Sequence, residues 1–339
     1  MTNSTPFTQF ILDAYLDVGL LKYLVFITVM CLYIVIIVSN VLLIVVICVN
    51  RSLHEPMYFF LCSLFVNELL GSTAVFPLLL TEILRDIHTI PVSFCFLQIF
   101  SIYSYANIEL CILAAMSYDR YLSICHPLQY HTNMTSTKVA VLIALTWGFP
   151  VVEVGVMVSL SAPLHLCGNV IPKVYCDNYY IVKLACSDIT VNNFYGIVYT
   201  VIIICSVLSV IIYSYSKILK VCFSGSKQTR HKAVSTCTPH IVSLLNFCFG
   251  CCFEIFQSRF NMTYLPTVLR VFLSLYFLTC QPLFSPLIYG LNLTKIRNIC
   301  KSIFCVNRMF YNLSVSAELG SNRHRWLISA SVLCCSVTP

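Results

Sequence analysis

Seven long apolar stretches constrain this chain more than any other feature of its sequence. Each is at least about 20 residues long, the length that an α-helix needs to cross the roughly 30 Å hydrocarbon core of a bilayer. Inside lipid, a single helix satisfies its own backbone hydrogen bonds, so each stretch is predicted to be a transmembrane helix. The stretches are Tyr23–Val49, Met57–Leu80, Phe94–Cys125, Val139–Ser161, Asn193–Tyr215, Ala233–Phe256 and Leu269–Tyr289.

Composition agrees with a chain that is solvated by lipid. Of the 339 residues, 59% are hydrophobic and 10% are charged, and the mean hydropathy is +0.87. The segment before the first stretch carries Asp13 and Asp17 and lacks the basic start of a signal peptide, so the first helix is expected to be retained. We predict an all-α membrane protein with an N-terminus at 1–22, a bundle at 23–289, a surface helix at 290–305 and a disordered tail at 306–339.

The distribution of Lys and Arg orients the bundle, because short cytoplasmic loops retain positive charge. If the N-terminus lies outside, fourteen of the twenty basic residues fall on the inner side. The formal charge is then zero outside, +11 inside and −4 within the spans. The six outer basic residues are Lys22, Arg85, Lys173, Lys183, Arg259 and Arg270. We therefore place the N-terminus outside and the C-terminus inside.

The net charge of +7 thus marks the cytoplasmic face and favours contact with anionic lipid headgroups rather than with nucleic acid. The chain shows no internal repeat of the kind found in many transporters. It also shows no nucleophile with a base, no metal-ligand spacing and no phosphate-binding loop, so we expect no enzyme activity. Glycosylation sequons at Asn3 and Asn261 fall outside, whereas those at Asn133, Asn292 and Asn312 fall inside and are interpreted as chance matches.

Four of the twenty cysteines fall on the oxidising side of the membrane: Cys95, Cys167, Cys176 and Cys186. The others lie in spans or in the reducing cytosol, where they act as small apolar residues. Four cysteines allow three pairings, and the sequence alone does not choose between them. Free thiols at the lipid boundary are the alternative to disulfide bonds.

Acidic residues inside the spans are costly, so each is a candidate functional residue. Glu68 and Glu109 lie in the middle of the second and third helices, where facing carboxylates would bind a cation such as Na⁺ or share a proton. Alternatively, each is protonated and satisfied by a hydroxyl or amide such as those of Asn40 and Ser285. Two further acids, in the outer halves of their helices, either face a ligand cavity or extend to the membrane boundary: Glu153 and Glu254.

The third span ends with Asp119, Arg120 and Tyr121, which places an acid beside an arginine where the helix meets water. Such a pair stabilises a resting state, and its separation would free Arg120 to bond the backbone of an inserted partner. The alternative is an ordinary solvated ion pair, which contributes little to stability.

Several strings occur along the chain in the following order: Leu53-His54-Glu55-Pro56-Met57-Tyr58, Met116-Ser117-Tyr118-Asp119-Arg120-Tyr121, Ile124-Cys125-His126-Pro127-Leu128, Ser214-Tyr215, Lys232-Ala233-Val234-Ser235-Thr236-Cys237 and Pro286-Leu287-Ile288-Tyr289. Together they resemble the motifs of the odorant-receptor branch of the rhodopsin-like G-protein-coupled receptors. The resemblance covers about residues 7–304. The strings Asn67-Glu68-Leu69 and Gly71-Ser72 are more similar to fish receptors than to mammalian ones.

The resemblance implies particular roles for these residues. It pairs Cys95 with Cys176, which leaves Cys167 and Cys186 as a second bridge. Where the family has Asp, Gly and Asn, this chain has Glu68, Ser39 and Ser285, so a sodium or water site formed by Asn40, Glu68, Glu109 and Ser285 is expected in an altered form. The surface that faces the G protein is expected around Asp119, Arg120, Tyr121, Tyr215, Lys232 and Tyr289.

The resemblance also implies a ligand pocket between the outer halves of the third, fifth, sixth and seventh helices. Aromatic residues there have the alternative of simple packing between helices. After the seventh span, residues 294–304 have the spacing of an amphipathic helix on the inner membrane face, with Cys300 and Cys305 as acylation candidates. The expected pocket residues are Ile102, Tyr103, Ala106, Asn107, Phe247, Cys248, Leu278 and Thr279.

The leading hypothesis is therefore an odorant receptor in the plasma membrane, expected in the cilia of olfactory neurons. A small odorant binds within the bundle and shifts the population toward a form that engages a heterotrimeric G protein of the stimulatory olfactory type, raising cyclic AMP. One alternative is a non-olfactory chemosensory receptor of the same class, which the tissue location of the transcript would reveal. Another is a transporter built on Glu68 and Glu109, which substrate flux in vesicles would reveal. No cofactor other than a bound sodium ion is expected.

Overall fold

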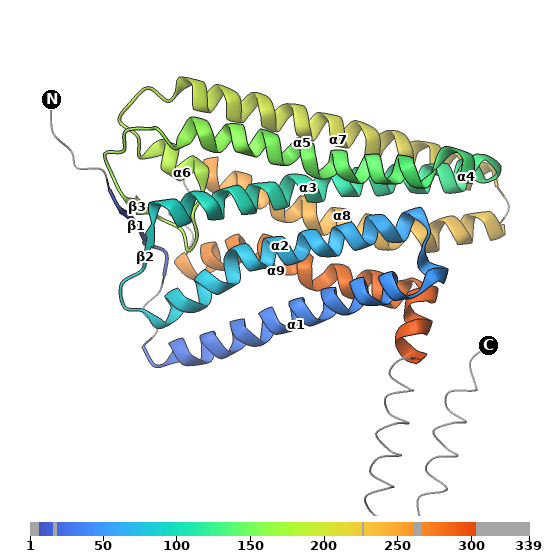
Figure 1. Ribbon diagram of the computed structural model, residues 1–339, viewed down its shortest axis with the longest axis horizontal. Coiled ribbons are helices and arrows are strands. Elements are labelled where there is room, and N and C mark those ends of the chain that lie inside the picture. Colours follow the sequence, from blue (N-terminus) through green and yellow to red (C-terminus); the bar gives the residue numbers. More distant parts are fainter. Residues whose placement is uncertain (1–6, 16–18, 226, 260–265, 303–339) are drawn as a thin grey trace, which may run out of the picture.

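Seven long helices form the body of the protein in a computed structural model, which describes residues 7–15, 19–225, 227–259 and 266–302 (Figure 1). All seven are long and apolar enough to cross a membrane, as predicted. Two short helices, α4 (Tyr130–Asn133) and α6 (Asn178–Lys183), lie in the connections. The seven are α1 (Leu21–Val49), α2 (Pro56–Leu84), α3 (Val92–Cys125), α5 (Ser136–Ser161), α7 (Thr190–Ser224), α8 (Lys227–Arg259) and α9 (Thr267–Asn292).

The predicted spans agree with these helices to within a few residues at most ends. The main differences are at the inner ends of α7 and α8, which extend nine and six residues beyond the predicted boundaries of Tyr215 and Ala233. The added turns carry Lys217, Lys220 and Lys227 among their residues. Such polar turns continue the helix into water, where an apolar window cannot detect them.

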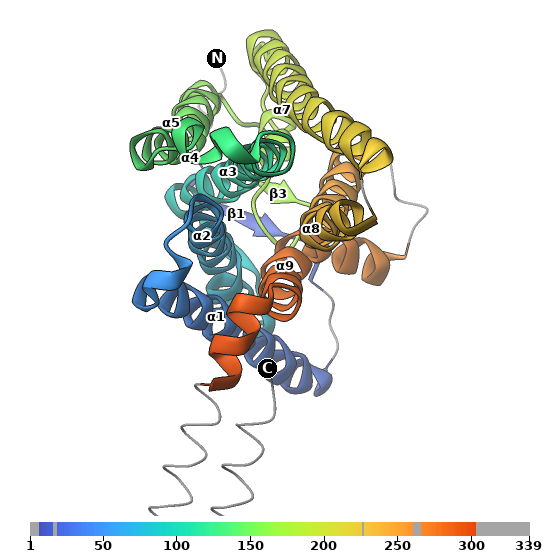
Figure 2. The ribbon, with the colours of Figure 1, turned by 90° about the vertical axis from the view of Figure 1, so that its right-hand side faces the viewer.

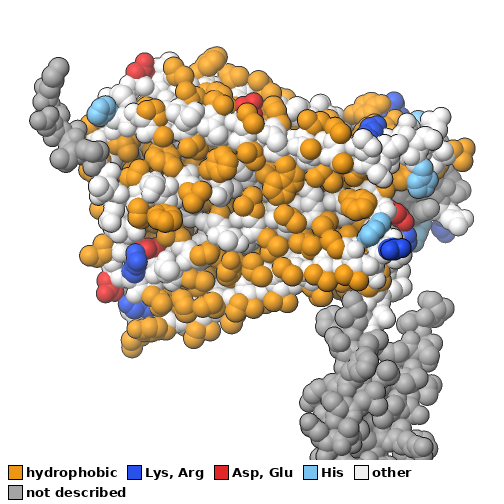
Figure 3. Space-filling model, viewed as in Figure 1, with side chains coloured by type: hydrophobic (Ala, Val, Ile, Leu, Met, Phe, Trp, Pro, Cys, Tyr) orange, Lys and Arg blue, Asp and Glu red, His pale blue; other side chains and the backbone are white. Residues whose placement is uncertain are grey.

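The third helix occupies the centre of the bundle. Viewed along the bundle (Figure 2), α3 has α2, α5, α7 and α8 around it, and it contacts all four. In the most apolar window of α2 and of α3, 61% of the residues are buried, against 17% in α7. Many of the residues exposed on the outer helices are large and apolar, and Figure 3 shows hydrophobic side chains over the flank between the two ends. These are the faces that lipid would cover.

A small sheet at the outer end departs from the all-α prediction. Strand β1 (Gln9–Leu12) lies between β2 (Thr89–Pro91), to which it is antiparallel, and β3 (Val170–Ile171), to which it is parallel. Phe10 and Leu12 alternate with exposed residues and are buried against the bundle. Strands this short are stabilised by their tertiary packing, so their pattern in the sequence is too brief to identify them.

Both predicted disulfide bonds are confirmed. Cys95, in the first turn of α3, is bonded to Cys176, and Cys167 is bonded to Cys186 within the outer loop before α7. The amide of Cys176 also donates to Oε1 of Gln98 at 2.9 Å. The long outer loop is therefore fixed to the third helix over the end of the bundle.

The inner end closes with a helical segment at residues 294–302. Ile296 is buried there, and Lys295 pairs with Glu55 at 2.7 Å. A helix is therefore present within the predicted range of 290–305, its contact with the membrane surface stays a prediction, and Cys300 lies half-buried on it. Asn3, Asn261, Cys305 and the tail at 306–339 lie outside the described residues.

Candidate functional site

The inner site is built on the buried pair of Asp119 and Arg120. Nε of Arg120 donates to Oδ2 of Asp119 at 3.1 Å, and the other carboxylate oxygen accepts a hydrogen bond from the hydroxyl of Tyr130 at 2.7 Å. Asp119 is fully buried, and the Arg120 side chain is 12% exposed. The alternative of a solvated ion pair is therefore wrong for this state. A buried pair is costly to separate unless new partners replace the lost ones.

A histidine that the sequence analysis missed connects three helices just above this pair. His240 of α8 is buried, and its Nε2 lies 3.0 Å from the carbonyl oxygen of Leu113 in α3. Its Nδ1 is hydrogen-bonded to the hydroxyl of Tyr215 in α7. A histidine inside an apolar span was the available signal. The bridge holds α8 against α3 and α7 at the inner end.

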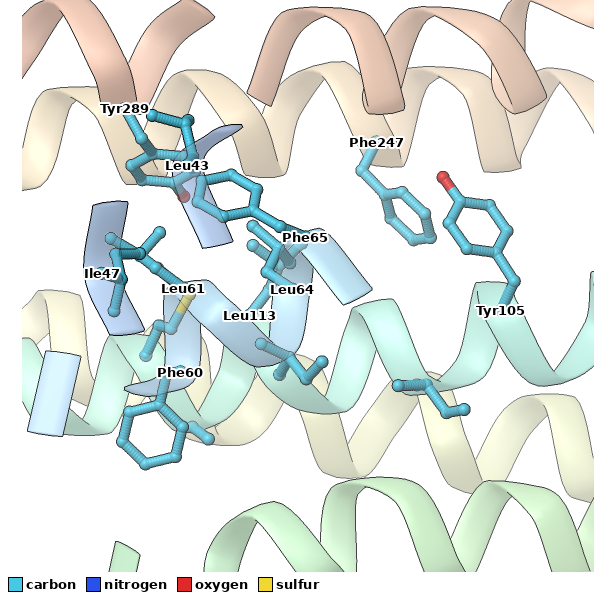
Figure 4. Close-up of a cluster of buried hydrophobic side chains, with 14 of the residues drawn as sticks. Leu43, Ile47, Phe60, Leu61, Leu64, Phe65, Tyr105, Leu113, Phe247 and Tyr289 are labelled. Carbon is cyan, nitrogen blue, oxygen red and sulfur yellow. The ribbon is translucent and has the colours of Figure 1, made fainter. Parts of the chain in front are cut away.

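The remaining predicted inner residues are Tyr121, Tyr289 and Lys232. Tyr121 is half-buried, and its hydroxyl lies 3.0 Å from Nε2 of His126. Tyr289 is buried, and Figure 4 shows it beside Leu43 and Phe65, whose ring it meets edge-on at 6.4 Å. Lys232 lies in α8, but its side chain is outside the described part of the structure.

The middle of the bundle holds the two predicted acids in different surroundings. Glu109 accepts hydrogen bonds from Asn67 at 2.9 Å and from Gln281 at 3.1 Å. Gln281 also donates to Ser243 at 2.8 Å, which links α3, α8 and α9. Glu68 is fully buried; no hydrogen bond of ordinary distance and angle reaches its carboxylate among the described residues, and its polar neighbours are the hydroxyl of Ser285 and Glu109. Gln281 and Ser243 were missed, although a polar residue in mid-span was their signal.

The other two members of the expected cation site also carry oxygens. The amide of Asn40 donates to the carbonyls of Ile36 and Pro282, both at 2.9 Å. Its Oδ1 has no partner among the described residues, and the hydroxyl of Ser285 lies beside the carboxylate of Glu68. The cluster thus combines two carboxylates with neutral oxygens, which are the ligands that hard cations prefer.

The predicted pocket residues are only partly brought together. Ile102, Phe247 and Leu278 belong to one buried cluster, and Ala106 packs against it. Tyr103 packs against a second cluster, nearer the outer sheet. The other three show no contact that joins the helices around the predicted pocket. The amide of Asn107 donates to the carbonyl of Tyr103 in its own helix, and Cys248 and Thr279 are half-buried in α8 and α9. Roles in ligand contact for these eight residues stay predictions.

The two outer acids are both engaged by partners from other elements. Oε2 of Glu153 accepts from the hydroxyl of Tyr195 at 2.6 Å. Oε1 of Glu254 accepts from the hydroxyl of Tyr175 at 2.7 Å and from the ammonium of Lys173. Neither acid is therefore a free residue at the membrane boundary, and Glu254 lies beneath the outer loop.

Lys173, which the sequence analysis treated as one outer charge among six, is almost completely buried. Its ammonium also donates to Asp177 at 3.1 Å. Burial alone would lower the pKa of Lys173, but the carboxylates of Asp177 and Glu254 outweigh it and raise that pKa well above its usual value. The lysine is therefore charged at neutral pH and links the outer loop to α8.

Comparison with known proteins adds independent observations. The sequence profile described as "Olfactory receptor" matches residues 29–307. The chain is 34% identical over 309 residues to human "Olfactory receptor 11A1", covering 91% of this chain and 97% of that protein. It is 34% identical over 284 residues to human "Olfactory receptor 52B2", covering 82% and 87%. The fold resembles the crystal structure of squid rhodopsin with a TM-score of 0.69 at 15% identity, covering 86% of this chain and 87% of that one.

Proposed function

The chain belongs to the olfactory receptor family, and on this premise we propose that a small odorant binds in the outer half of its bundle and activates a heterotrimeric G protein inside. It is a multi-pass receptor of the plasma membrane and not an enzyme. Coupling to a stimulatory olfactory G protein, residence in neuronal cilia and contact with anionic lipid belong to the proposal. The fish-type resemblance stays a prediction, since the relatives described above are human.

The inner ion pair carries this proposal. The Asp119 carboxylate uses one oxygen for Arg120 and the other for Tyr130, so the arginine is occupied in the described state. His240 holds α8 to α3 and α7 at the same level. A ligand that favours a state with α8 displaced would weaken the bridge and release Arg120 toward the cytoplasm.

The test is the loss of signalling without the loss of the receptor. Arg120→Ala should leave surface expression intact but abolish odorant-dependent cyclic AMP in cells that supply an olfactory G protein. Arg51→Ala is the matched control, because Arg51 is an exposed arginine at the same inner end. A full response from Arg120→Ala would contradict the proposal, and a lost response from Arg51→Ala would show that any inner arginine is needed.

We also propose that Glu68 and Glu109 bind a sodium ion, with Asn40 and Ser285 supplying neutral oxygens. The burial of Glu68 beside Glu109 and Ser285, together with the unpartnered Oδ1 of Asn40, supports this. Bound sodium would stabilise the resting state by mass action. The melting temperature of the purified receptor should rise with NaCl relative to equal KCl, and Glu68→Gln should remove the difference. Equal melting curves in both salts would favour a shared proton instead.

The non-olfactory alternative concerns where the receptor is made. Transcript confined to a tissue other than olfactory epithelium would favour it. Membership of this family gives no support to the transporter hypothesis. Substrate flux into vesicles that contain the purified protein, lost in the Glu68→Gln variant, would be needed to support it.

A further inference from the structure

Helix α8 is tied to α3 near its inner end. Nε2 of His240 lies 3.0 Å from the carbonyl oxygen of Leu113 in α3. Glu254 follows His240 by fourteen residues, which places it about 21 Å further along α8 at 1.5 Å per residue. A helix that is fixed at one point can still tilt about that point. A second tie at the outer end would therefore decide whether α8 is held along its whole length.

The outer loop before α7 is fixed to α3 and to the N-terminal strand. Cys176 forms the disulfide bond with Cys95 of α3, and its amide donates to Oε1 of Gln98 at 2.9 Å. A few residues earlier, strand β3 at 170–171 pairs with β1. The segment 172–175 between these two attachments is held at both ends, so it stays in place relative to α3.

Two side chains of this segment reach α8. The ammonium of Lys173 is hydrogen-bonded to Glu254, and the hydroxyl of Tyr175 donates to the same carboxylate at 2.7 Å. The side chain of Lys173 is 1% exposed and that of Glu254 is 17% exposed, so the contact is largely shielded from water. Hydrogen bonds to charged groups in such surroundings are stronger than neutral ones. We call Lys173, Tyr175 and Glu254 the outer latch, because they join the fixed loop to α8.

The charges around the outer latch balance. Asp177 also accepts from Lys173, at 3.1 Å, and Arg270 of α9 lines the small cavity that Lys173 borders. Two cations and two carboxylates therefore meet beneath the loop. If Glu254 moves away, Lys173 keeps Asp177 as its partner, so the large cost of an unpaired buried charge does not arise. The latch can thus open without disrupting the outer end of the bundle.

Resting on the function proposed above, we propose that the outer latch is an inhibitory constraint: it holds the outer end of α8 to the loop, and so to α3, in the resting state and opens in the signalling state. The described structure is the resting form, because Arg120 is occupied by Asp119. A contact that is present at rest and lost on signalling biases the equilibrium toward rest. Lys173, Tyr175 and Glu254 are thus positioning residues that set the ligand-independent signal through α8.

The experiment measures ligand-independent cyclic AMP from the full-length receptor, normalised to surface expression, in cells that supply an olfactory G protein. Glu254→Gln should raise it about tenfold, the lower end of the range expected for a hydrogen bond to a charged group. Tyr175→Phe should raise it less, because the bond from Lys173 remains. Glu153→Gln is the matched control and should leave it unchanged, since that acid is bonded to Tyr195 and joins α5 to α7.

Two double variants show whether the rise passes through the latch and the inner site. Lys173→Met combined with Glu254→Gln should raise the signal by less than the product of the two single effects, because both changes open the same tie. Arg120→Ala combined with Glu254→Gln should return the signal to that of cells without receptor. A change that only loosened the fold would lower surface expression and would not depend on Arg120.

If Glu254→Gln does not reach the surface, Tyr175→Phe decides by the same measurement, because it leaves the ion pair intact. An unchanged or lowered signal in the expressed latch variants, an equal rise in Glu153→Gln, a fully multiplicative double variant or a rise that survives Arg120→Ala would overturn the proposal. An odorant response in the parent, with no rise in the latch variants, would overturn the latch while leaving the receptor function intact. No cyclic AMP from the parent or any variant, with or without odorants, would overturn both.

Discussion

Gly71 lies where α2 approaches the ring of Tyr105 in α3, and it offers a sharp test of the packing behind the pocket. A Cβ placed on Gly71 would lie 2.5 Å from Cδ2 and 2.6 Å from Cγ of that ring. Carbon atoms prefer about 3.5 Å or more, so the ring would have to move by roughly 1 Å. Tyr105 is fully buried and lies 5.8 Å from the ring of Phe277, which leaves it little room to move. Gly71→Ala should therefore be destabilising despite the better helix propensity of alanine.

The magnitude follows from two opposing effects. Overpacking a core costs about 1–3 kcal/mol, and replacing glycine by alanine within a helix returns up to about 1 kcal/mol. We expect a net loss of about 1–2 kcal/mol, or a few degrees in melting temperature at about 2–4 °C per kcal/mol. Gly155→Ala is the matched control, because no atom lies within 4 Å of its added Cβ. That variant should be neutral or more stable than the parent receptor.

The assay is thermal unfolding of the purified receptor, with the double variant Gly71→Ala, Tyr105→Leu as a check on the cause. A smaller side chain at position 105 should absorb the added methyl, so the two losses should sum to more than the loss in the double variant. Tyr105 precedes two predicted pocket residues, so Gly71→Ala should also weaken the odorant response. Equal melting temperatures for Gly71→Ala and Gly155→Ala would refute the reasoning.

Three further predictions concern the two ends of the bundle. Asp119→Asn should raise ligand-independent cyclic AMP, because the charged partner of Arg120 is lost. Tyr130→Phe should raise it less, and unchanged basal cyclic AMP in both variants would contradict the role of the Asp119–Arg120 pair as a switch. Cys95→Ser should reduce thermal stability more than Cys186→Ser, by about 1 kcal/mol in the chain-entropy account, because its bridge closes a separation of 81 residues against 19; the opposite order of melting temperatures would contradict this. Because the pKa of Lys173 is raised in the folded state, its ionic contribution to stability is present below about pH 10.5 and is lost only as the pH rises through the folded-state pKa. The difference in melting temperature between the parent receptor and Lys173→Met should therefore be constant from pH 7 to about 10.

Sequence alone identified the features that depend on local pattern. Hydropathy located all seven spans, and the positions of Lys and Arg oriented them. The inner motif placed Asp119 and Arg120 at a helix end, and the structure adds that Tyr130 completes the pair. The family resemblance, not the spacing of the cysteines, chose between the three disulfide pairings.

The features that sequence analysis missed depend on which helix faces meet. Gln281 and Glu109 are 172 positions apart, and their contact requires the rotation of α9 against α3 to be known. In the sequence Lys173 resembles any other loop lysine, and only the structure shows that its side chain is buried against Asp177 and Glu254. His240 became informative only when its partners on α3 and α7 were visible. The sequence pattern therefore predicts the helices, whereas the hydrogen-bond networks between them depend on how the helices face one another.

The central position of β1 has a consequence for the biosynthesis of the receptor. Residues 9–12 precede all seven long helices, yet they pair with residues 170–171, which follow the fourth long helix, α5. The strand can pair with β2 once residues 89–91 have been made, but its other edge stays open on the outer side until residues 170–171 follow. Completion of the sheet would therefore mark the point at which the first four membrane helices are all in place, and a chain stalled before that point would display an open strand edge to chaperones in the secretory compartment.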